Sequence, residues 1–317
     1  MINNNDTKKT KLSVLIPAYN EAESVATLYQ SLQEALRNLN TPFEIIFIND
    51  GSTDNTLAEL KKLKAVKIIN FRKNFGQTAA LDAGIKEAIG EIIIAMDADG
   101  QNDPKDISLL LDKINEGYDV VSGWRWQRKD KLMKKFCSRG ANFLRKFLVN
   151  DGIHDSGCTL KAYRRECFDH VDLYGEMHRF IPAILRWRGF KIGEVKVNHL
   201  PRKKGKTKYN WERVPKGFLD MLSVWFWRKY ANRPLHLFGG IGLFLTITGS
   251  ITLAVLLGLR LFGLISLYGR IWPLIAVLLI LTGVQFFVFG ILADITVKNH
   301  YKVTKQEPYQ IKEIIEQ

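Results

Sequence analysis

Two aspartates separated by one residue are the side chains best suited to chemistry in this chain of 317 residues. Asp97 and Asp99 follow the apolar run 91–96, which has the length and composition of a strand. A backbone that turns at the end of a strand can bring two carboxylates near one point, and Mg²⁺ commonly takes one or two carboxylates together with substrate phosphate oxygens. The other use of a loop carboxylate is to cap the next helix, and Asp103 before Pro104 fits that use better. We therefore predict that Asp97 and Asp99 hold Mg²⁺ or Mn²⁺.

The elements that must position these aspartates alternate between strands and helices. Short apolar runs end in polar clusters, and helical patterns follow them. The predicted strands cover 11–16, 43–48, 66–70 and 91–96, and the predicted helices cover 25–36, 57–63 and 77–89. Pro17 is expected to end the first strand. The alternation predicts an α/β domain with a mostly parallel sheet, covered on both faces, that binds its ligand at the carboxyl ends of the strands.

Polar residues after the other strands are expected at the same edge of the sheet. Asn20 and Glu21 follow the first predicted strand, and Asn49 and Asp50 follow the second. The Asp50 carboxylate can accept hydrogen bonds from a base or a ribose there, whereas Asp54 fits better as a helix cap. Neither GxxxxGK[ST] nor GxGxxG follows the first strand, which disfavours a P-loop ATPase and a dinucleotide oxidoreductase.

Five short motifs occur in the order in which family 2 glycosyltransferases carry them. They are Pro17-Ala18-Tyr19-Asn20-Glu21, NDGSTD at 49–54, RKNFGQ at 72–77, MDADGQ at 96–101 and DSGC at 155–158. The sequence most resembles the bacterial relatives of dolichol-phosphate mannose synthase that carry two C-terminal spans, and the resemblance covers nearly the whole chain. It implies a GT-A nucleotide-diphospho-sugar transferase fold, inversion at the anomeric carbon, and a divalent metal on the donor diphosphate.

The resemblance also implies roles for individual side chains. The residues expected to bind the nucleotide sugar are Pro17, Tyr19, Asn20, Glu21, Asp50, Lys73, Gln77, Asp97 and Ala98. The expected metal ligands are Asp97, Asp99 and Gln101, and Asp97, Asp99 and Asp155 are expected to be catalytic. Arg125 is a further expected catalytic residue, chosen for its charge and its position at the start of a basic stretch and not from the resemblance. Asp155 can orient the acceptor or act as a base, and its other possible use is as a turn residue. Ala183 stands where processive polysaccharide synthases have the glutamine of QxxRW, which favours a single transfer over polymer extrusion.

Two long uncharged segments predict a transmembrane hairpin. Residues 235–259 and 271–293 contain no formally charged side chain, and each segment can cross the ~30 Å hydrocarbon core. The alternative is a pair of buried helices in a soluble protein. The flanks are basic, so the positive-inside rule places both of them in the cytoplasm of a multi-pass inner (cytoplasmic) membrane protein. The predicted parts are a cytoplasmic GT-A catalytic domain at 1–213, an amphipathic interfacial helix at 214–234, the hairpin at 235–296 and a cytoplasmic tail at 297–317.

The charge of the chain indicates an anionic partner. The formal net charge is +14, and residues 125–146 and 202–208 are strongly basic. Apolar residues interleave the first of these stretches, which indicates a helix near a negative membrane surface. Nucleic acid is disfavoured because nothing resembles a module that reads a groove. Three cysteines without a CxxC spacing favour neither a disulfide framework nor a zinc site.

A polyprenyl phosphate, such as undecaprenyl phosphate, is the predicted acceptor, and a UDP-hexose is the favoured nucleotide-diphosphate sugar. A phosphate monoester is largely dianionic at neutral pH and needs no strong general base, whereas a sugar hydroxyl does. The cations predicted to hold the acceptor phosphate are Arg125, Arg202 and Lys206. Two alternatives are a transferase that acts on a glycolipid or glycan hydroxyl, and a non-catalytic membrane scaffold that binds nucleotide sugars. The intact Asp97 and Asp99 pair disfavours the scaffold. The sequence leaves the oligomeric state open, and a homo-oligomer is one outcome that the resemblance allows.

Overall fold

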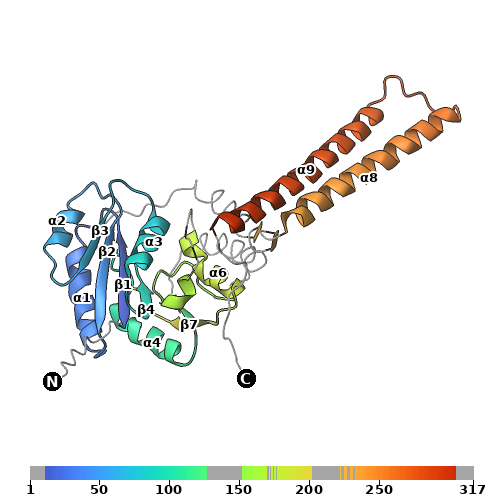
Figure 1. Cartoon of the computed structure of the whole chain (residues 1–317). Helices are drawn as coiled ribbons and strands as arrows, with labels where there is room; N and C mark the ends of the chain where they lie inside the picture. The colour runs from blue at the N-terminus through green and yellow to red at the C-terminus, as the bar shows by residue number, and fades with distance from the viewer. Residues whose placement is uncertain are drawn as a thin grey trace. The chain divides into compact units, whose positions relative to one another are not determined.

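The chain forms two compact units, Met1–Met221 and Leu222–Gln317 (Figure 1). The computed structural model describes residues 11–126, 152–201 except 170, 172, 174 and 176, then 222, 225, 226, 229, 230 and 233–304. Most of the basic stretch 125–146 and of the predicted interfacial helix lies outside these residues. Arg202 and Lys206, predicted for the acceptor phosphate, also lie outside them.

A mixed sheet of seven strands organises the first unit. Its strands are β1 (Leu12–Ala18), β2 (Phe43–Asn49), β3 (Lys67–Asn70), β4 (Ile92–Ala95), β5 (Val120–Trp124), β6 (Lys161–Arg164) and β7 (Ile192–Lys196), in the order β3-β2-β1-β4-β6-β5-β7. The pairs β1–β2, β1–β4, β2–β3 and β5–β7 are parallel. Only β6 runs against its neighbours β4 and β5 among the described strands. The predicted mostly parallel α/β sheet is therefore confirmed.

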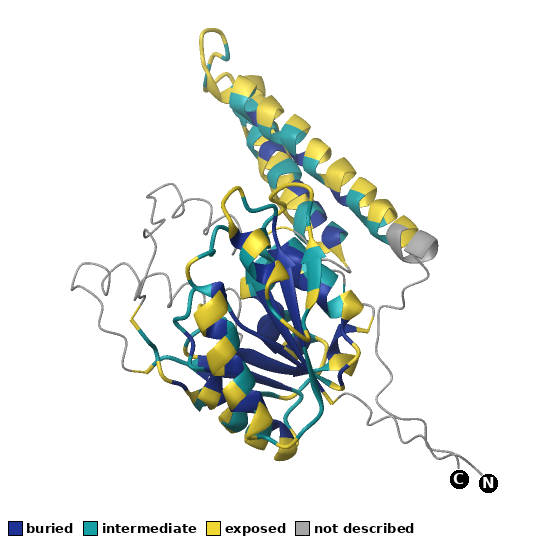
Figure 2. Cartoon of the chain, turned by 90° about the vertical axis from the view of Figure 1, so that its left-hand side faces the viewer, coloured by how far each residue is buried: buried dark blue, intermediate teal, exposed yellow. Residues whose placement is uncertain are grey.

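Helices cover both faces of this sheet because side chains alternate along each strand. On β1, Val14 and Ile16 belong to one core cluster and Leu15 belongs to the other. The first cluster packs under α1 (Val25–Arg37), α2 (Thr56–Lys61) and α4 (Ile107–Asn115). The second packs under α3 (Gln77–Glu87) and α6 (Ile181–Trp187). Figure 2 shows the strands buried between these layers.

The prediction that Pro17 ends the first strand is wrong, because β1 continues through Pro17 to Ala18. Met96 N donates to Leu15 O, so the backbone of residue 15 hydrogen-bonds toward β4. Because the direction alternates along a strand, the backbone of residue 17 also points toward β4. However, β4 ends at Ala95, and Pro17 faces no partner that needs an N–H donor. The other edge of β1 stays paired, since Asp50 N donates to Ala18 O at 2.9 Å. A proline is tolerated where the neighbouring strand has ended.

Of the two carboxylates predicted as helix caps, Asp103 is the N-cap of a helix, whereas Asp54 precedes the N-cap Asn55 by one residue and still accepts a hydrogen bond from the first turn. Asp54 Oδ1 accepts a hydrogen bond from Thr56 N at 2.9 Å at the start of α2. Asp103 Oδ1 accepts one from Lys105 N at 3.0 Å, at the start of the 3₁₀ helix η1 (Pro104–Asp106). Satisfying the first free N–H groups of a helix in this way is the usual function of an N-cap aspartate. The capped turn after Asp99 therefore begins a helix, which leaves Asp97 and Asp99 for other chemistry.

The second unit contains two long apolar helices, α8 (Pro234–Leu261) and α9 (Trp272–Thr304). Residues 234–261 and 272–299 are each long and apolar enough to cross a membrane, which agrees with the predicted C-terminal helix pair. Small residues let the two backbones approach closely: a Cβ on Gly242 would lie 2.5 Å from Gly283 O, and one on Gly249 would lie 2.7 Å from Ala276 O. Such close contacts between small residues are typical of helix pairs in lipid.

Candidate active site

The carboxyl ends of β1, β2 and β4 surround a cavity of about 260 Å³. It is lined by Pro17, Ala18, Tyr19, Glu21, Asp50, Asn74, Gly76, Gln77, Asp97, Ala98 and Asp99. The strand ends thus bring together most of the side chains expected to bind a nucleotide sugar. Of the other residues expected to bind the donor or the metal, Asn20, Lys73 and Gln101 lie outside the lining.

The loop after β4 holds its two aspartates in place through neighbouring amides. Gln77 Nε2, at the start of α3, donates to Asp97 Oδ1 at 2.7 Å, and Gln101 N donates to Asp99 Oδ1 at 3.1 Å. Burial and the charge of Asp99 raise the pKa of Asp97 to about 6. A divalent cation would offset this crowding of like charge, and two carboxylates facing an open cavity match the partial ligand set that Mg²⁺ uses with phosphates. The residues present therefore fit a metal of this kind.

A chain of hydrogen bonds supports Asp97 from the other side. Asn102 Nδ2 donates to Thr159 Oγ1 at 2.9 Å, and the Thr159 hydroxyl is hydrogen-bonded to Asp97. Gln101 contributes through its backbone, because its carbonyl oxygen accepts from Leu200 N at 2.9 Å. Among the described residues, no group of three or more His, Cys, Asp or Glu side chains is placed to hold a metal. Gln101 as a metal ligand stays a prediction.

Asp50 is almost completely buried at the end of β2, with 4% of its surface exposed. Its Oδ1 accepts from Phe75 N at 2.7 Å and its Oδ2 accepts from Gly76 N at 3.0 Å. The neighbouring Gly51 has φ +62°, and a Cβ there would lie 2.2 Å from the backbone carbon of Lys73. Lys73 itself places Nζ 5.1 Å from the centre of the Phe75 ring. A carboxylate has about four lone-pair positions, so Asp50 keeps acceptor capacity toward the cavity.

Asn20 joins two loops that form the wall of the cavity. Its backbone is left-handed, with φ 56°, a conformation that asparagine adopts more readily than most residues. Its Oδ1 accepts from Thr53 N at 2.8 Å, and its N donates to Ser52 Oγ at 3.0 Å. This geometry makes Asn20 a residue that positions Tyr19 and Glu21 on either side of it, and its predicted contact with the donor stays untested.

Arg125 and Asp155, two predicted catalytic residues, form a bidentate ion pair. Arg125 Nε lies 2.7 Å from Asp155 Oδ2 and Nη2 lies 2.9 Å from Oδ1, with the two side chains 14% and 16% exposed. Gly157 N also donates to Asp155 Oδ1 at 3.2 Å. The pair uses two of the five guanidinium donors and both carboxylate oxygens. Asp155 is therefore better arranged to hold Arg125 than to remove a proton.

Lys161 is a buried cation beside this site that the sequence analysis did not identify. It lies on β6 opposite Ala95, two residues before Asp97, and is 4% exposed. Its Nζ donates to Ser156 O at 3.4 Å and to Cys158 O. Burial lowers the pKa of Lys161, although Cys158, Asp155 and Asp97 oppose that shift. The signal in the sequence was a lysine three residues after the DSGC motif, at the start of the short strand KAYR.

If Asp97 binds a metal as predicted, we expect Lys161→Met to reduce sugar transfer by about 10- to 100-fold, the usual effect of removing a group that supports a metal ligand from outside; Lys161 does so through its charge near Asp97. The methionine keeps the apolar stem but removes the charge near Asp97 and the donor for the carbonyl groups of the 156–158 turn. Transfer rate and the Mn²⁺ concentration for half-maximal rate measure the effect. Lys113→Met is the matched control, since Lys113 pairs with Glu116 on the surface of the domain. Equal rates for the two variants would show that Lys161 has no such function.

His178 is a second buried polar residue that sequence reasoning missed. It belongs to η3 (Met177–Arg179), and its Nδ1 lies 2.8 Å from Thr78 Oγ1. Burial, with the charges of Arg179 and Lys161, lowers the pKa of His178 to about 3, so the ring is neutral at physiological pH. Thr78 follows Gln77 in α3. The contact therefore fixes the start of the helix whose first residue holds Asp97.

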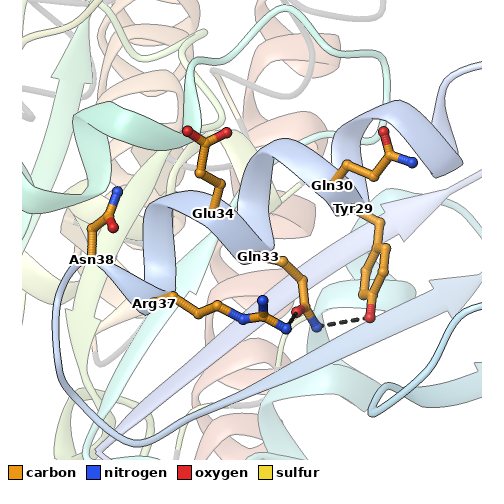
Figure 3. Close-up of a pocket in the computed structure, with 6 residues that line it drawn as sticks. All are labelled: Tyr29, Gln30, Gln33, Glu34, Arg37 and Asn38. Atoms are coloured by element: carbon orange, nitrogen blue, oxygen red, sulfur yellow. Dashed lines mark hydrogen bonds between the residues drawn. The ribbon is translucent and has the colours of Figure 1, made fainter.

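Another hollow, of about 440 Å³, lies along the outer surface of α1 (Figure 3). It is lined by Tyr29, Gln30, Gln33, Glu34, Arg37 and Asn38. Gln33 Nε2 donates to Tyr29 Oη at 2.7 Å, and Arg37 Nη2 donates to Gln33 Oε1 at 2.8 Å. Three of these polar side chains are thus joined along one helix, and none of the predicted site residues lines this hollow. The hollow at the strand ends is the better candidate for the active site.

This arrangement defines a GT-A nucleotide-diphospho-sugar transferase domain: a mostly parallel sheet with two aspartates and a cavity at its carboxyl edge. Residues 13–172 match the model for glycosyl transferase family 2, and the chain belongs to this family. A glucosyl-3-phosphoglycerate synthase from Mycobacterium tuberculosis, solved with Mn²⁺, UDP-glucose and phosphoglyceric acid, is similar with TM-score 0.56 at 16% identity. The match covers 69% of this chain and 79% of that one, and it shows the fold.

Relatives with closer sequences match along almost the whole chain. A dodecaprenyl-phosphate galacturonate synthase from Rhizobium johnstonii is 38% identical, over 99% of this chain and 95% of the relative. An undecaprenyl-phosphate 4-deoxy-4-formamido-L-arabinose transferase from Yersinia enterocolitica is 34% identical, over 97% of this chain and 94% of the relative. The similarity therefore includes the C-terminal apolar helices as well as the sheet.

Proposed function

We propose that this protein transfers a sugar from a nucleotide-diphosphate sugar to a polyprenyl phosphate at the cytoplasmic face of the inner membrane. A UDP-hexose is the favoured donor and undecaprenyl phosphate the favoured acceptor. The observation that carries the proposal is the cavity at the strand ends, where Asp50 and the Asp97 and Asp99 pair face the same space. The names of the two relatives, both polyprenyl-phosphate sugar transferases, support the acceptor class.

The donor would lie between β2 and β4. Asp50 offers its remaining lone pairs to a base or ribose, and Tyr19 lines the same cavity. Asp97 and Asp99 would hold Mg²⁺ or Mn²⁺, which when bound supplies positive charge for the diphosphate leaving group. Gln77 and Thr159 keep the Asp97 carboxylate oriented toward the cavity. The relatives' names span a hexuronate and a modified pentose, so the sugar itself is the part of the proposal that most needs a direct test.

The acceptor would approach from the side of Arg125. A lipid phosphate that is already dianionic attacks the anomeric carbon without losing a proton to the protein. The engagement of both Asp155 oxygens by Arg125 supports this choice, since that carboxylate is poorly placed to serve as a base. Arg125 retains guanidinium donors beyond the two in the pair and would steer the phosphate. A sugar hydroxyl as acceptor would need a positioned base, which the described part of the site supports less well.

The test uses the full-length protein in lipid vesicles with a panel of radiolabelled donors: UDP-glucose, UDP-galacturonate, UDP-N-acetylglucosamine and GDP-mannose. Each donor is offered undecaprenyl phosphate, dodecaprenyl phosphate or the corresponding polyprenol. We expect label in a lipid product with the phosphates and none with the polyprenol, because only the phosphate supplies a ready nucleophile. Failure with every polyprenyl phosphate, or preferred labelling of a glycolipid hydroxyl, would contradict the proposal. Loss of the product in mild acid, which cleaves a sugar phosphodiester from the lipid, is the check on its linkage.

A further inference from the structure

A glutamine lies midway along the second apolar helix. Gln285 is at the centre of the 272–299 segment of α9, and its side chain is exposed on the surface of the helix pair. The hydroxyl groups of Thr246, Thr248 and Thr296 each donate to the carbonyl four residues earlier, at 2.8 Å. The Gln285 amide makes no such bond within the described part of the chain. Hydrocarbon offers no partner either, so an amide at this depth favours contact with another polar group.

The neighbours of Gln285 on the same face form a regular line. Moving along α9 from Gln285 in alternating steps of three and four residues gives only aliphatic side chains, each 46% to 69% exposed. They are Leu274, Leu278, Leu281, Val288, Leu292 and Ile295. This spacing is the a and d pattern of a left-handed helix pair, with Gln285 at an a position. We call these seven residues the α9 seam.

The opposite face of α9 is already occupied by α8. Ala276, Gly283 and Gly290 recur every seven residues and lie at the f position of the same heptad, which is farthest from a and d. A Cβ on Gly283 would lie 2.6 Å from Gly242 O, and one on Gly290 would lie 3.0 Å from the Leu235 side chain. The helix pair therefore uses the small residues for its own packing. The α9 seam cannot be covered from within the same hairpin.

We propose that the α9 seam binds the α9 seam of a second copy of this chain, with Gln285 hydrogen-bonded to Gln285 at the contact. An amide carries both a donor and an acceptor, so two copies satisfy each other reciprocally across a two-fold axis. Copies inserted with one topology have parallel α9 helices, which places the two glutamines at the same depth. A single polar a residue is also the device that fixes register in parallel helix pairs. Lipid chains, including the isoprenoid of the proposed acceptor, offer the amide no partner.

The inference rests on the membrane placement in the proposed function, and its test uses the full-length protein. Protein carrying donor or acceptor fluorophores on a C-terminal tag is reconstituted in phosphatidylethanolamine and phosphatidylglycerol vesicles at decreasing protein-to-lipid ratios. The dependence of energy transfer on dilution gives a dissociation constant in the membrane. We expect Gln285→Leu to raise that constant about 5- to 30-fold, which corresponds to about 1–2 kcal/mol for a hydrogen bond between spans. Gln285→Asn keeps an amide and should stay within a few-fold of the wild type.

Thr248→Leu is the matched control, because Thr248 is also exposed near the middle of an apolar helix but its hydroxyl is satisfied by Phe244 O. It should leave the dissociation constant unchanged. A wild type that is monomeric at every ratio, or a Gln285→Leu constant equal to the wild-type one, would overturn the inference. Release of the protein from membranes by alkaline carbonate would overturn both this inference and the membrane placement. If Gln285→Leu loses association, the α9 seam is supported even where no sugar donor in the panel gives a product. The proposed interface and the proposed function can therefore be refuted independently.

Discussion

Replacing Asp99 by alanine should lower sugar transfer at least about 100-fold, because the change removes one of the two carboxylates that we propose to hold the metal at the leaving diphosphate. The fold should persist. Asp99 lies in a loop at the edge of the cavity, and its described hydrogen bond is to Gln101 N, in the same turn. Removing a negative charge also relieves the repulsion that, together with burial, raises the pKa of Asp97. The melting temperature should therefore fall little or even rise.

The measurements are the initial rate of lipid labelling and the heat of UDP binding with and without Mn²⁺. Asp103→Ala is a matched control, since it removes another carboxylate four residues further along the same segment. Asp103 caps η1, and its loss should cost about 1 kcal/mol of stability while the transfer rate stays near that of the wild type. Full activity of the wild type in excess chelator would refute the proposed metal dependence. A normal rate for Asp99→Ala would refute the proposal that this carboxylate holds the metal.

The sequence was sufficient to predict which strand ends would surround the candidate cavity. Continuous apolar strands followed by polar clusters placed Glu21, Asp50 and Asp97 at one edge of a parallel sheet, and the structure brings them around one cavity. This succeeded because the direction of a parallel strand is set by its crossover helix, so every strand end falls on the same edge. The uncharged segments were equally clear, since few other structures require more than twenty apolar residues in a row.

The contacts that hold the site together were harder to predict, because they join segments far apart in the sequence. The charge of Lys161 lies near Asp97 only because β6 inserts antiparallel beside β4, and the spacing of residues in the chain does not specify that order of strands. The Pro17 error has a similar origin: proline ended the predicted strand on local grounds, while its effect depends on where β4 stops. His178 and Thr78, one hundred residues apart, are likewise neighbours only in the folded domain.

Arg125 illustrates a different limit of the sequence. Its charge and position predicted a contact with the acceptor phosphate, yet the structure shows that its guanidinium is shared with Asp155. The two residues are thirty positions apart. Their pairing gives Arg125 a second possible function, which is to stabilise the turn of the DSGC motif at 155–158. A single alanine substitution cannot separate these functions, because it would also leave the partly buried carboxylate of Asp155 without its cation.

A pair of substitutions separates them. Arg125→Ala alone should destabilise the domain by about 1–3 kcal/mol, the usual cost of removing a charged hydrogen-bond partner, because this ion pair is only partly buried, and it should also abolish detectable transfer. The double variant Arg125→Met with Asp155→Leu removes both charges, and replacing a whole pair by apolar side chains is often neutral for stability. We expect its melting temperature to return to within a few degrees of the wild type.

The affinity for the acceptor should stay low in the double variant even though its stability recovers. If Arg125 holds the lipid phosphate, the double variant keeps a KM for undecaprenyl phosphate raised at least about tenfold, the typical consequence of losing a charge-assisted hydrogen bond. Its affinity for UDP should stay normal, since neither residue lines the donor cavity. Asp155→Asn should retain measurable transfer, because a lipid phosphate needs no base and the amide oxygen can still accept from Arg125. A normal KM in the double variant would show that Arg125 only stabilises the structure and does not bind the acceptor phosphate. An Asp155→Asn variant that is folded but inactive would indicate instead that Asp155 is a general base.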